Sequence, residues 1–310
     1  MEDRQIQVLI EQANVQRGLS NWRGAIDLLQ RALSLDPDHV HAHATLALAL
    51  LGARRLPGAG IEARMALALD GNDSFCHYVA AHVMYAERKL DDAWSHCLVA
   101  IETDLHDAEA HVLGAAIRNL RGELTKAREL LKTALEIEPG HTGALVKLAR
   151  MELTARNHEA AAGYAEQALR SSPSDNDAHV AAGLIDLARG NDASAEGHAR
   201  FALGQDSTDQ DAIHLWAAIK AHRSPVLGLW WRFHMFVSMR TDAGELGLLI
   251  GSFVVVEILT ILAGHFDLDR IKSILDWGWL GFCAYTWFAP TLFKRMLAND
   301  LGTVILDPDF

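Results

Sequence analysis

Histidine is the residue type with the clearest chemical potential in this chain of 310 residues, which contains 16 of them. Four are separated by multiples of 34 residues, namely His43, His77, His111 and His179. A column of imidazoles could ligate a metal ion or respond to pH. The alternative, which we favour, is that histidine fills a half-buried place between packed helices.

The other motifs that could carry chemistry are incomplete. The spacing of His39 and His43 would allow both to bind one metal ion. We interpret the nearest carboxylates, Asp36 and Asp38, as turn and cap residues rather than as further ligands. The segment 158–162 begins like a zinc-protease helix and has alanine where the second histidine must stand. No phosphate-binding loop is present, and the glycines near 244–251 do not follow a strand. The sequence therefore predicts no metal, no cofactor and no catalytic residues.

The elements that would position any site follow a strict period. Six units of 34 residues run without insertion, over 6–39, 40–73, 74–107, 108–141, 142–175 and 176–209. Three columns hold small residues, and one of them is Ala32, Ala66, Ala100, Ala134, Ala168 and Ala202. Small residues at a fixed period indicate places where helix backbones approach closely, as in stacked antiparallel helix pairs.

These columns, together with prolines at place 32 of several units (Pro37, Pro139 and Pro173), resemble the tetratricopeptide repeat. The resemblance covers about two-thirds of the chain and implies an all-α fold, a right-handed superhelix of six repeats. A further helix at 210–222 should close the array, with Trp216 covering the exposed core of the last unit. We therefore expect a repeat domain over 1–223.

The resemblance also implies which residues line the concave face. Those that we expect to bind a partner are Leu48, Leu51, Phe75, Tyr78, His82, Tyr85, Val112, Asn119, Arg150 and Leu184. Relatives that grip acidic chaperone termini use several cations at such places, whereas here Arg150 is nearly alone. A largely apolar wall suits an amphipathic helix or a hydrophobic peptide. The alternative is a groove closed by its own side chains.

After residue 224 the composition becomes apolar. A Trp-rich segment, 224–243, suits the lipid headgroup zone and includes Trp230, Trp231 and Arg232. Two runs, about 246–264 and 274–293, approach the roughly 20 residues that cross a bilayer, so 244–297 is predicted to be a transmembrane helical hairpin. A short tail, 298–310, follows. The alternative is a pair of core helices in a small soluble domain.

Charge and targeting signals place the predicted domains. No basic, apolar leader opens the chain, and cations flank both ends of the hairpin more than its connecting loop. We therefore expect an inner (cytoplasmic) membrane protein with a cytosolic repeat domain. Three cysteines fit reduced thiols, and a net charge of −12 argues against nucleic-acid binding.

Two carboxylates inside the apolar runs, Glu257 and Asp276, should face protein rather than lipid, because an intramembrane charge is expensive. The resulting hypothesis is a non-catalytic, membrane-anchored adaptor or scaffold that recruits or assembles protein partners, with lipid and other membrane subunits as further contacts. One alternative is a permanent structural subunit of a larger membrane complex. A lower-ranked alternative is a membrane enzyme or metal-dependent protein that uses these carboxylates and the histidines.

Overall fold

The computed structural model describes residues 2–223, 256–262, 265, 270, 272–273, 275, 277–281 and 288. The chain divides into two compact units, Met1–Pro173 and Ser174–Phe310. The expected all-helical repeat fold is confirmed in both units. The boundary between the units therefore lies inside the repeat array, whereas the composition of the sequence changes only after residue 224.

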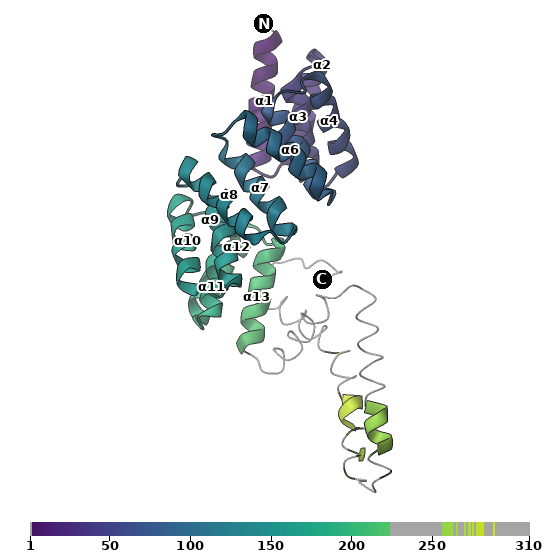
Figure 1. The fold of residues 1–310 in the computed structure, drawn as a ribbon, viewed down its shortest axis with the longest axis vertical. Helices are drawn as coiled ribbons and strands as arrows, with labels where there is room; N and C mark the ends of the chain where they lie inside the picture. Colours follow the sequence, from purple (N-terminus) through teal and green to yellow (C-terminus); the bar gives the residue numbers. More distant parts are fainter. Residues whose placement is uncertain are drawn as a thin grey trace. The chain divides into compact units, whose positions relative to one another are not determined.

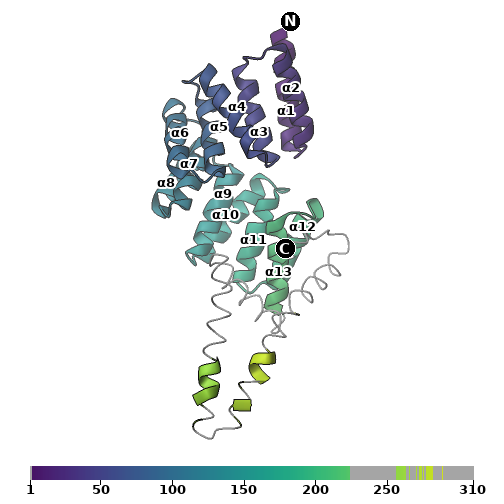
Figure 2. The same cartoon turned by 90° about the vertical axis from the view of Figure 1, so that its right-hand side faces the viewer.

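The first unit consists of ten helices that pack as five successive pairs (Figure 1 and Figure 2). They are α1 (Glu2–Gly18), α2 (Trp22–Leu35), α3 (Val40–Gly52), α4 (Leu56–Leu69), α5 (Ser74–Ala86), α6 (Leu90–Thr103), α7 (Ala108–Leu120), α8 (Leu124–Ile137), α9 (Thr142–Thr154) and α10 (His158–Ser171). Each pair corresponds to one 34-residue unit of the sequence.

Side-chain caps begin several of the first helices of these pairs. The Asp73 carboxylate accepts a hydrogen bond from the Cys76 amide at 2.8 Å, which satisfies one of the amides that a helix start leaves open. His141 does the same with its Nδ1 atom, which accepts from the Ala144 amide at 3.3 Å. These caps fix the residue at which the first helix of a repeat starts. The turn after that helix then sets where the second helix begins.

The turn between the two helices of each unit is formed in the same way throughout. One residue, at place 15 of the unit, has a positive φ, and these residues are Ser20, Arg54, Arg88, Gly122, Arg156 and Gly190. Only two of the six are glycine, the residue that adopts this conformation without steric strain. The shared conformation agrees with the constant length of the six 34-residue repeats.

The small-residue columns lie in the helix contacts, as predicted. Alanines at places 20 and 27 are almost completely buried in every unit, because a larger side chain would push the two backbones apart. Leu29, Ile117, Leu131 and Leu148 fill the space between these close contacts and are also fully buried. The core of the compact unit 1–173 is thus a series of apolar clusters between successive helices.

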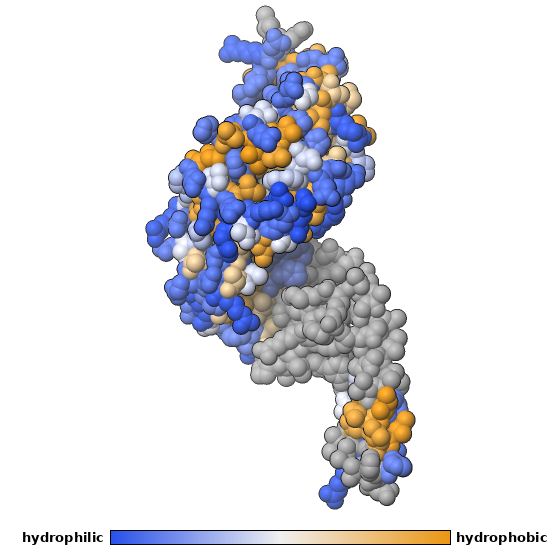
Figure 3. Space-filling view, viewed as in Figure 1, coloured by the Kyte–Doolittle hydropathy of each residue, from blue (hydrophilic) through white to orange (hydrophobic). Residues whose placement is uncertain are grey.

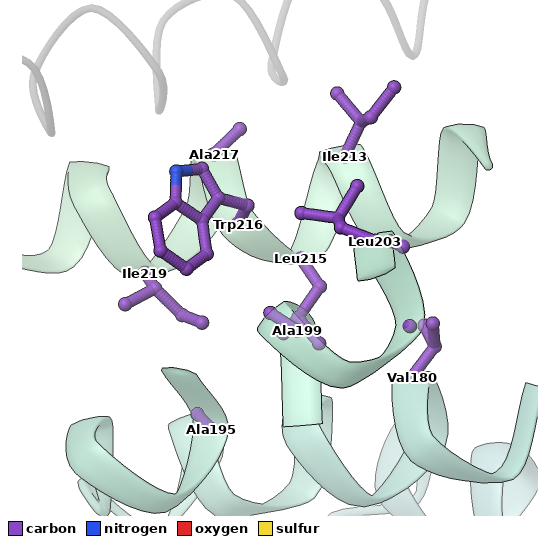
Figure 4. Packing of buried hydrophobic residues seen from close by; sticks show 11 residues of the cluster. Val180, Ala195, Ala199, Leu203, Ile213, Leu215, Trp216, Ala217 and Ile219 are labelled. Carbon is purple, nitrogen blue, oxygen red and sulfur yellow. The ribbon is translucent and has the colours of Figure 1, made fainter. Parts of the chain in front are cut away.

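The second unit contains α11 (Asn176–Ala188), α12 (Asp192–Gln205) and α13 (Gln210–Arg223) among its described residues. Helix α13 packs on both α11 and α12. Its Trp216 is 2% exposed and lies beside Leu215 and Ile219 in one apolar cluster (Figure 4). Gly183 of α11 leaves the space that Leu215 occupies, since an added Cβ would approach the leucine Cδ2 to 2.4 Å.

The membrane predictions fall mainly outside the described residues. These include Trp230, Trp231, Arg232, Asp276, the tail 298–310 and most of both proposed spans. Among the helices that are described, none is both long enough and apolar enough to cross a membrane. Glu257 lies in the described helical segment 256–262, where its side chain is exposed.

Candidate functional site

Three ring-bearing residues of α5, Phe75, Tyr78 and His82, form what we call the α5 ring cluster. The Phe75 and Tyr78 rings are stacked with centroids 6.2 Å apart, and the His82 ring meets Tyr78 edge-on at 4.9 Å. The Tyr78 hydroxyl and the His82 Nε2 atom are 3.1 Å apart, within hydrogen-bonding distance. All three side chains are half-buried, so they pack largely on one another.

Burial governs the electrostatics of this cluster. It raises the pKa of Tyr78 above its ordinary value and lowers the pKa of His82 to about 4. Glu109 of α7 opposes the shift at His82, whereas Lys147 of α9 and Arg17 of α1 reinforce it. His82 is consequently a neutral imidazole at physiological pH, surrounded by charged groups from three other helices.

An ion pair between the buried His141 and the exposed Glu109 adjoins the cluster. The His141 Nε2 atom lies 3.4 Å from the Glu109 carboxylate. This hydrogen bond lowers the pKa of Glu109 and raises that of His141, so both groups are stabilised in their charged forms. The pair joins the start of α7 to the start of α9, which are the helices that enclose the pocket described next.

A pocket of about 530 Å³ opens between α7, α8 and α9, and we call it the Tyr85 pocket. Its lining is formed by Tyr85, Ala115, Ala116, Asn119, Leu124, Arg128, Leu131, Lys147, Arg150, Met151, Thr154 and Ala155. Apolar atoms make most of the surface, and half of the lining residues supply a polar or charged group. This composition is typical of sites that take an apolar side chain and orient it with a small number of polar contacts.

The structure brings together three of the predicted residues, Tyr85, Asn119 and Arg150, in this pocket. It adds two cations that sequence reasoning missed, Arg128 and Lys147. Neither residue stands at a position that the family resemblance predicts to face the groove. Arg128 belongs to the second helix of its repeat, and Lys147 is one residue past such a position. The Arg128 Nε atom is 2.9 Å from the Glu152 carboxylate, which holds its guanidinium in place.

The remaining predicted groove residues pack against the cores of the repeats. Leu48 and Leu51 pack with Phe75 and Tyr78 against the core between α3 and α5. Val112 is buried in the core between α7 and α9, and Leu184 packs against the core of the second unit. The side chains of the α5 ring cluster thus contact one another and the neighbouring core, and their binding of a partner stays a prediction.

The histidine column does not form one cluster, because its members lie in successive repeats. His43, His77 and His179 each contact a residue on the second helix of their own repeat, whereas His111 contacts the Asp107 carbonyl oxygen at the end of the preceding repeat. His43 contacts Glu62 at 2.6 Å, and His77 contacts His96 at 3.0 Å. Within the described residues, no group of three potential metal ligands lies together. The Cys76 and Cys97 thiols are buried, and burial raises the pKa of each to about 12, so neither is a reactive nucleophile.

Comparison with protein families identifies the repeats. A model of the tetratricopeptide repeat matches residues 10–74 and 146–211. A comparison with curated protein sequences gave no significant match. The family match falls on both compact units and agrees with the 34-residue period, so the matched segments carry tetratricopeptide repeats.

Solved structures of low sequence identity share the fold. PilF of Pseudomonas aeruginosa is 16% identical, with 70% of this chain and 98% of that chain covered and a TM-score of 0.53. PilW, a type IV pilus biogenesis factor, is 16% identical over 68% and 98%, with a TM-score of 0.54. A thermophilic repeat protein of Thermus thermophilus is 22% identical over 59% and 99%, with a TM-score of 0.55. At these identities the likeness extends to the fold alone.

Proposed function

We propose that this chain, which carries tetratricopeptide repeats, is a non-catalytic scaffold that binds a segment of a partner protein in the Tyr85 pocket. The observation that carries the proposal is the pocket itself, an apolar hollow with three cationic side chains at its wall. The occupant that fits is a peptide or helix segment that offers one large apolar side chain with an acidic residue nearby.

Charge complementarity selects an acidic occupant. The chain carries a net charge of −12, so most of its surface repels an acidic segment. Lys147 and Arg150 place positive charge at the pocket wall within that field, beside an Arg128 that is paired with Glu152. An acidic partner segment is therefore steered to the pocket, where Tyr85 supplies ring area and a hydroxyl for its backbone.

We further propose that the C-terminal part anchors the scaffold to an inner membrane with the repeats on the cytosolic side. Large apolar side chains of the described C-terminal residues are exposed, among them Ile258, Ile261, Trp277, Leu280 and Phe288. Hydrophobic residues predominate in the described part of this region in Figure 3. Exposed apolar residues at this density are costly in water and favourable in lipid. A permanent place in a larger membrane complex is the alternative.

Charge reversal tests the pocket. Arg150→Glu places a carboxylate at its wall, and Lys132→Glu makes the same change of charge at an exposed position of the neighbouring helix α8. Full-length proteins purified in mild detergent would be compared for the partners that co-purify, and an identified partner segment would then be titrated by fluorescence anisotropy.

We expect Arg150→Glu to weaken this binding by at least about tenfold and Lys132→Glu to change it by less than about twofold. Equal losses for the two variants, or no loss for Arg150→Glu, contradict a binding role for the pocket. A partner that remains stoichiometric through purification favours a permanent subunit, whereas substoichiometric capture favours an adaptor.

A further inference from the structure

Two pairs of histidines face each other through the same ring atom. The Nδ1 atoms of His77 and His96 are 3.0 Å apart, and those of His179 and His198 are 2.9 Å apart. The ring centroids are separated by 5.1 Å in both pairs. Both pairs occupy places 4 and 23 of their units, so each joins the first and second helices of one repeat.

A hydrogen bond sets the orientation of one ring in the first pair, and a carboxylate lies near one ring in the second. The His77 Nε2 atom is 3.0 Å from the Gly71 carbonyl oxygen, which can only accept, so Nε2 carries the proton. In the neutral ring, Nδ1 then presents its lone pair to His96. In the other pair, the Nε2 atom of His198 lies 3.7 Å from the Asp186 carboxylate, which favours the same tautomer.

This arrangement is the one that metal-binding histidines adopt in proteins. A ligating imidazole generally donates its second N–H to a backbone carbonyl or a carboxylate, which fixes the tautomer and aims the other nitrogen at the metal. In the metal-free state a single proton can lie between the two facing Nδ1 atoms. The space between two such lone pairs is where a cation would replace that proton.

We propose that each histidine pair is a binding site for a divalent late first-row transition ion, such as Zn²⁺ or Cu²⁺, held by the two Nδ1 atoms. Zinc–nitrogen bonds of about 2.0–2.1 Å at a tetrahedral angle separate the two nitrogens by about 3.3 Å. The rings therefore need to spread by only about 0.3 Å from their present separation. Binding also moves the His96 proton from Nδ1 to Nε2, with no net release of protons.

Coordination is completed by water. Within the described chain, no third histidine, cysteine or carboxylate joins either pair to make a three-ligand set. The site therefore selects ions that accept imidazole nitrogen and retain water, and it excludes Mg²⁺ and Ca²⁺, which require oxygen ligands. Because the two ligands belong to different helices, the bound ion links those helices and stabilises the repeat.

Other units of the same chain supply matched controls. The fourth unit has His111 at place 4 and Leu130 at place 23, so it has one imidazole and no pair. The fifth unit has Leu145 and Tyr164 at these places. Leucine therefore occurs naturally at both places, and His77→Leu, His96→Leu and His198→Leu are changes that the repeat tolerates elsewhere.

The experiment is a titration of the full-length protein, purified without a polyhistidine tag and stripped of metal. Zn²⁺ and Cu²⁺ would be titrated by calorimetry, with Mg²⁺ as the control ion and circular dichroism as the check of folding. The variants are His96→Leu, the double variant His96→Leu with His198→Leu, and His111→Leu as the control histidine. His77→Leu removes the first site from the opposite helix, which separates ligand loss from local misfolding.

We expect wild type and His111→Leu to bind two equivalents of Zn²⁺ or Cu²⁺ in the tightest phase. His96→Leu and His77→Leu should each bind one equivalent, and the double variant should bind none in that phase. The melting temperature should rise with Zn²⁺ in wild type and not in the double variant. The proposal is overturned if the double variant keeps the wild-type stoichiometry and affinity, or if His111→Leu loses as much as His96→Leu. Binding of the partner segment to the Tyr85 pocket is measured separately, so failure of the metal proposal and failure of the proposed function can be told apart.

Discussion

Lowering the pH should destabilise the compact unit Met1–Pro173, and protonation of His82 should contribute more to this loss of stability than protonation of an exposed histidine. The pKa of this imidazole is about 6.5 in the unfolded chain and about 4 in the folded chain, because burial disfavours the charged ring. Below the unfolded value, the unfolded chain takes up the proton first. Stability from this group is therefore complete above pH 6.5 and is lost as the pH falls toward 4.

The magnitude follows from linkage. Integrating proton uptake by the two states from about pH 7.5 to about pH 4.5 gives a loss of about 2.5 kcal/mol in the free energy of unfolding from this one residue. Glutamine keeps a polar group near the position of Nε2, where it can still reach the Tyr78 hydroxyl, and it does not titrate. His82→Gln should therefore remove most of that pH dependence.

Urea unfolding of the full chain in mild detergent, followed by circular dichroism at the two pH values, measures this difference. Wild type should lose about 2.5 kcal/mol more than His82→Gln on acidification. The exposed His106 provides the control, since His106→Gln removes an imidazole outside the core. If wild type and His82→Gln lose equal stability, or if the His82 ring signal in NMR titrates near neutral pH, the reasoning about burial is refuted.

Further predictions concern the repeat and the membrane segment. Arg88→Gly should raise the free energy of unfolding by about 1 kcal/mol, because glycine adopts the positive φ without strain. Gly122→Arg should lower the free energy of unfolding by a similar amount, and changes of the same sign in the two variants would contradict the argument. Ala134→Leu should cost about 1–3 kcal/mol by overpacking a fully buried contact, whereas Lys132→Leu on the exposed face of the same helix should cost little in urea unfolding. Alkaline carbonate should leave the full chain in the membrane pellet and release a chain ending at residue 223; recovery of both in the supernatant would exclude an anchor. Glu257→Gln should preserve insertion in that assay, and loss of the pellet fraction would show that the charge is needed for it.

The regular features of the fold could be predicted because each recurs six times. The alanine columns, the 34-residue period and the apolar positions of Trp216 and its neighbours all follow from helix packing, which leaves a direct mark on residue size. The positive φ at place 15 was less visible, since arginine occupies it at least as often as glycine. Its physical signal is the fixed spacing between helices and not the residue type.

The pocket and the histidine pairs were harder to predict. Tyr85, Asn119 and Arg150 lie on first helices, whose inward places are known from the resemblance, and these three do meet. Arg128 and Lys147 lie elsewhere, and only the packing of α8 on α9 brings them to the same pocket. His96 is likewise 19 residues from His77, a spacing that has meaning only once two helices are paired.

Site-specific photo-crosslinking tests the central claim of a partner bound in the Tyr85 pocket most directly. A benzophenone amino acid would replace Tyr85 in one variant and Met65, which is 42% exposed on α4, in the other. After irradiation of membranes that contain the full chain, mass spectrometry would identify the cross-linked peptides. The account predicts that one partner segment with an apolar and an acidic side chain is captured from position 85 and not from position 65. Capture of the same segment equally from both positions, or of lipid alone from position 85, would contradict it.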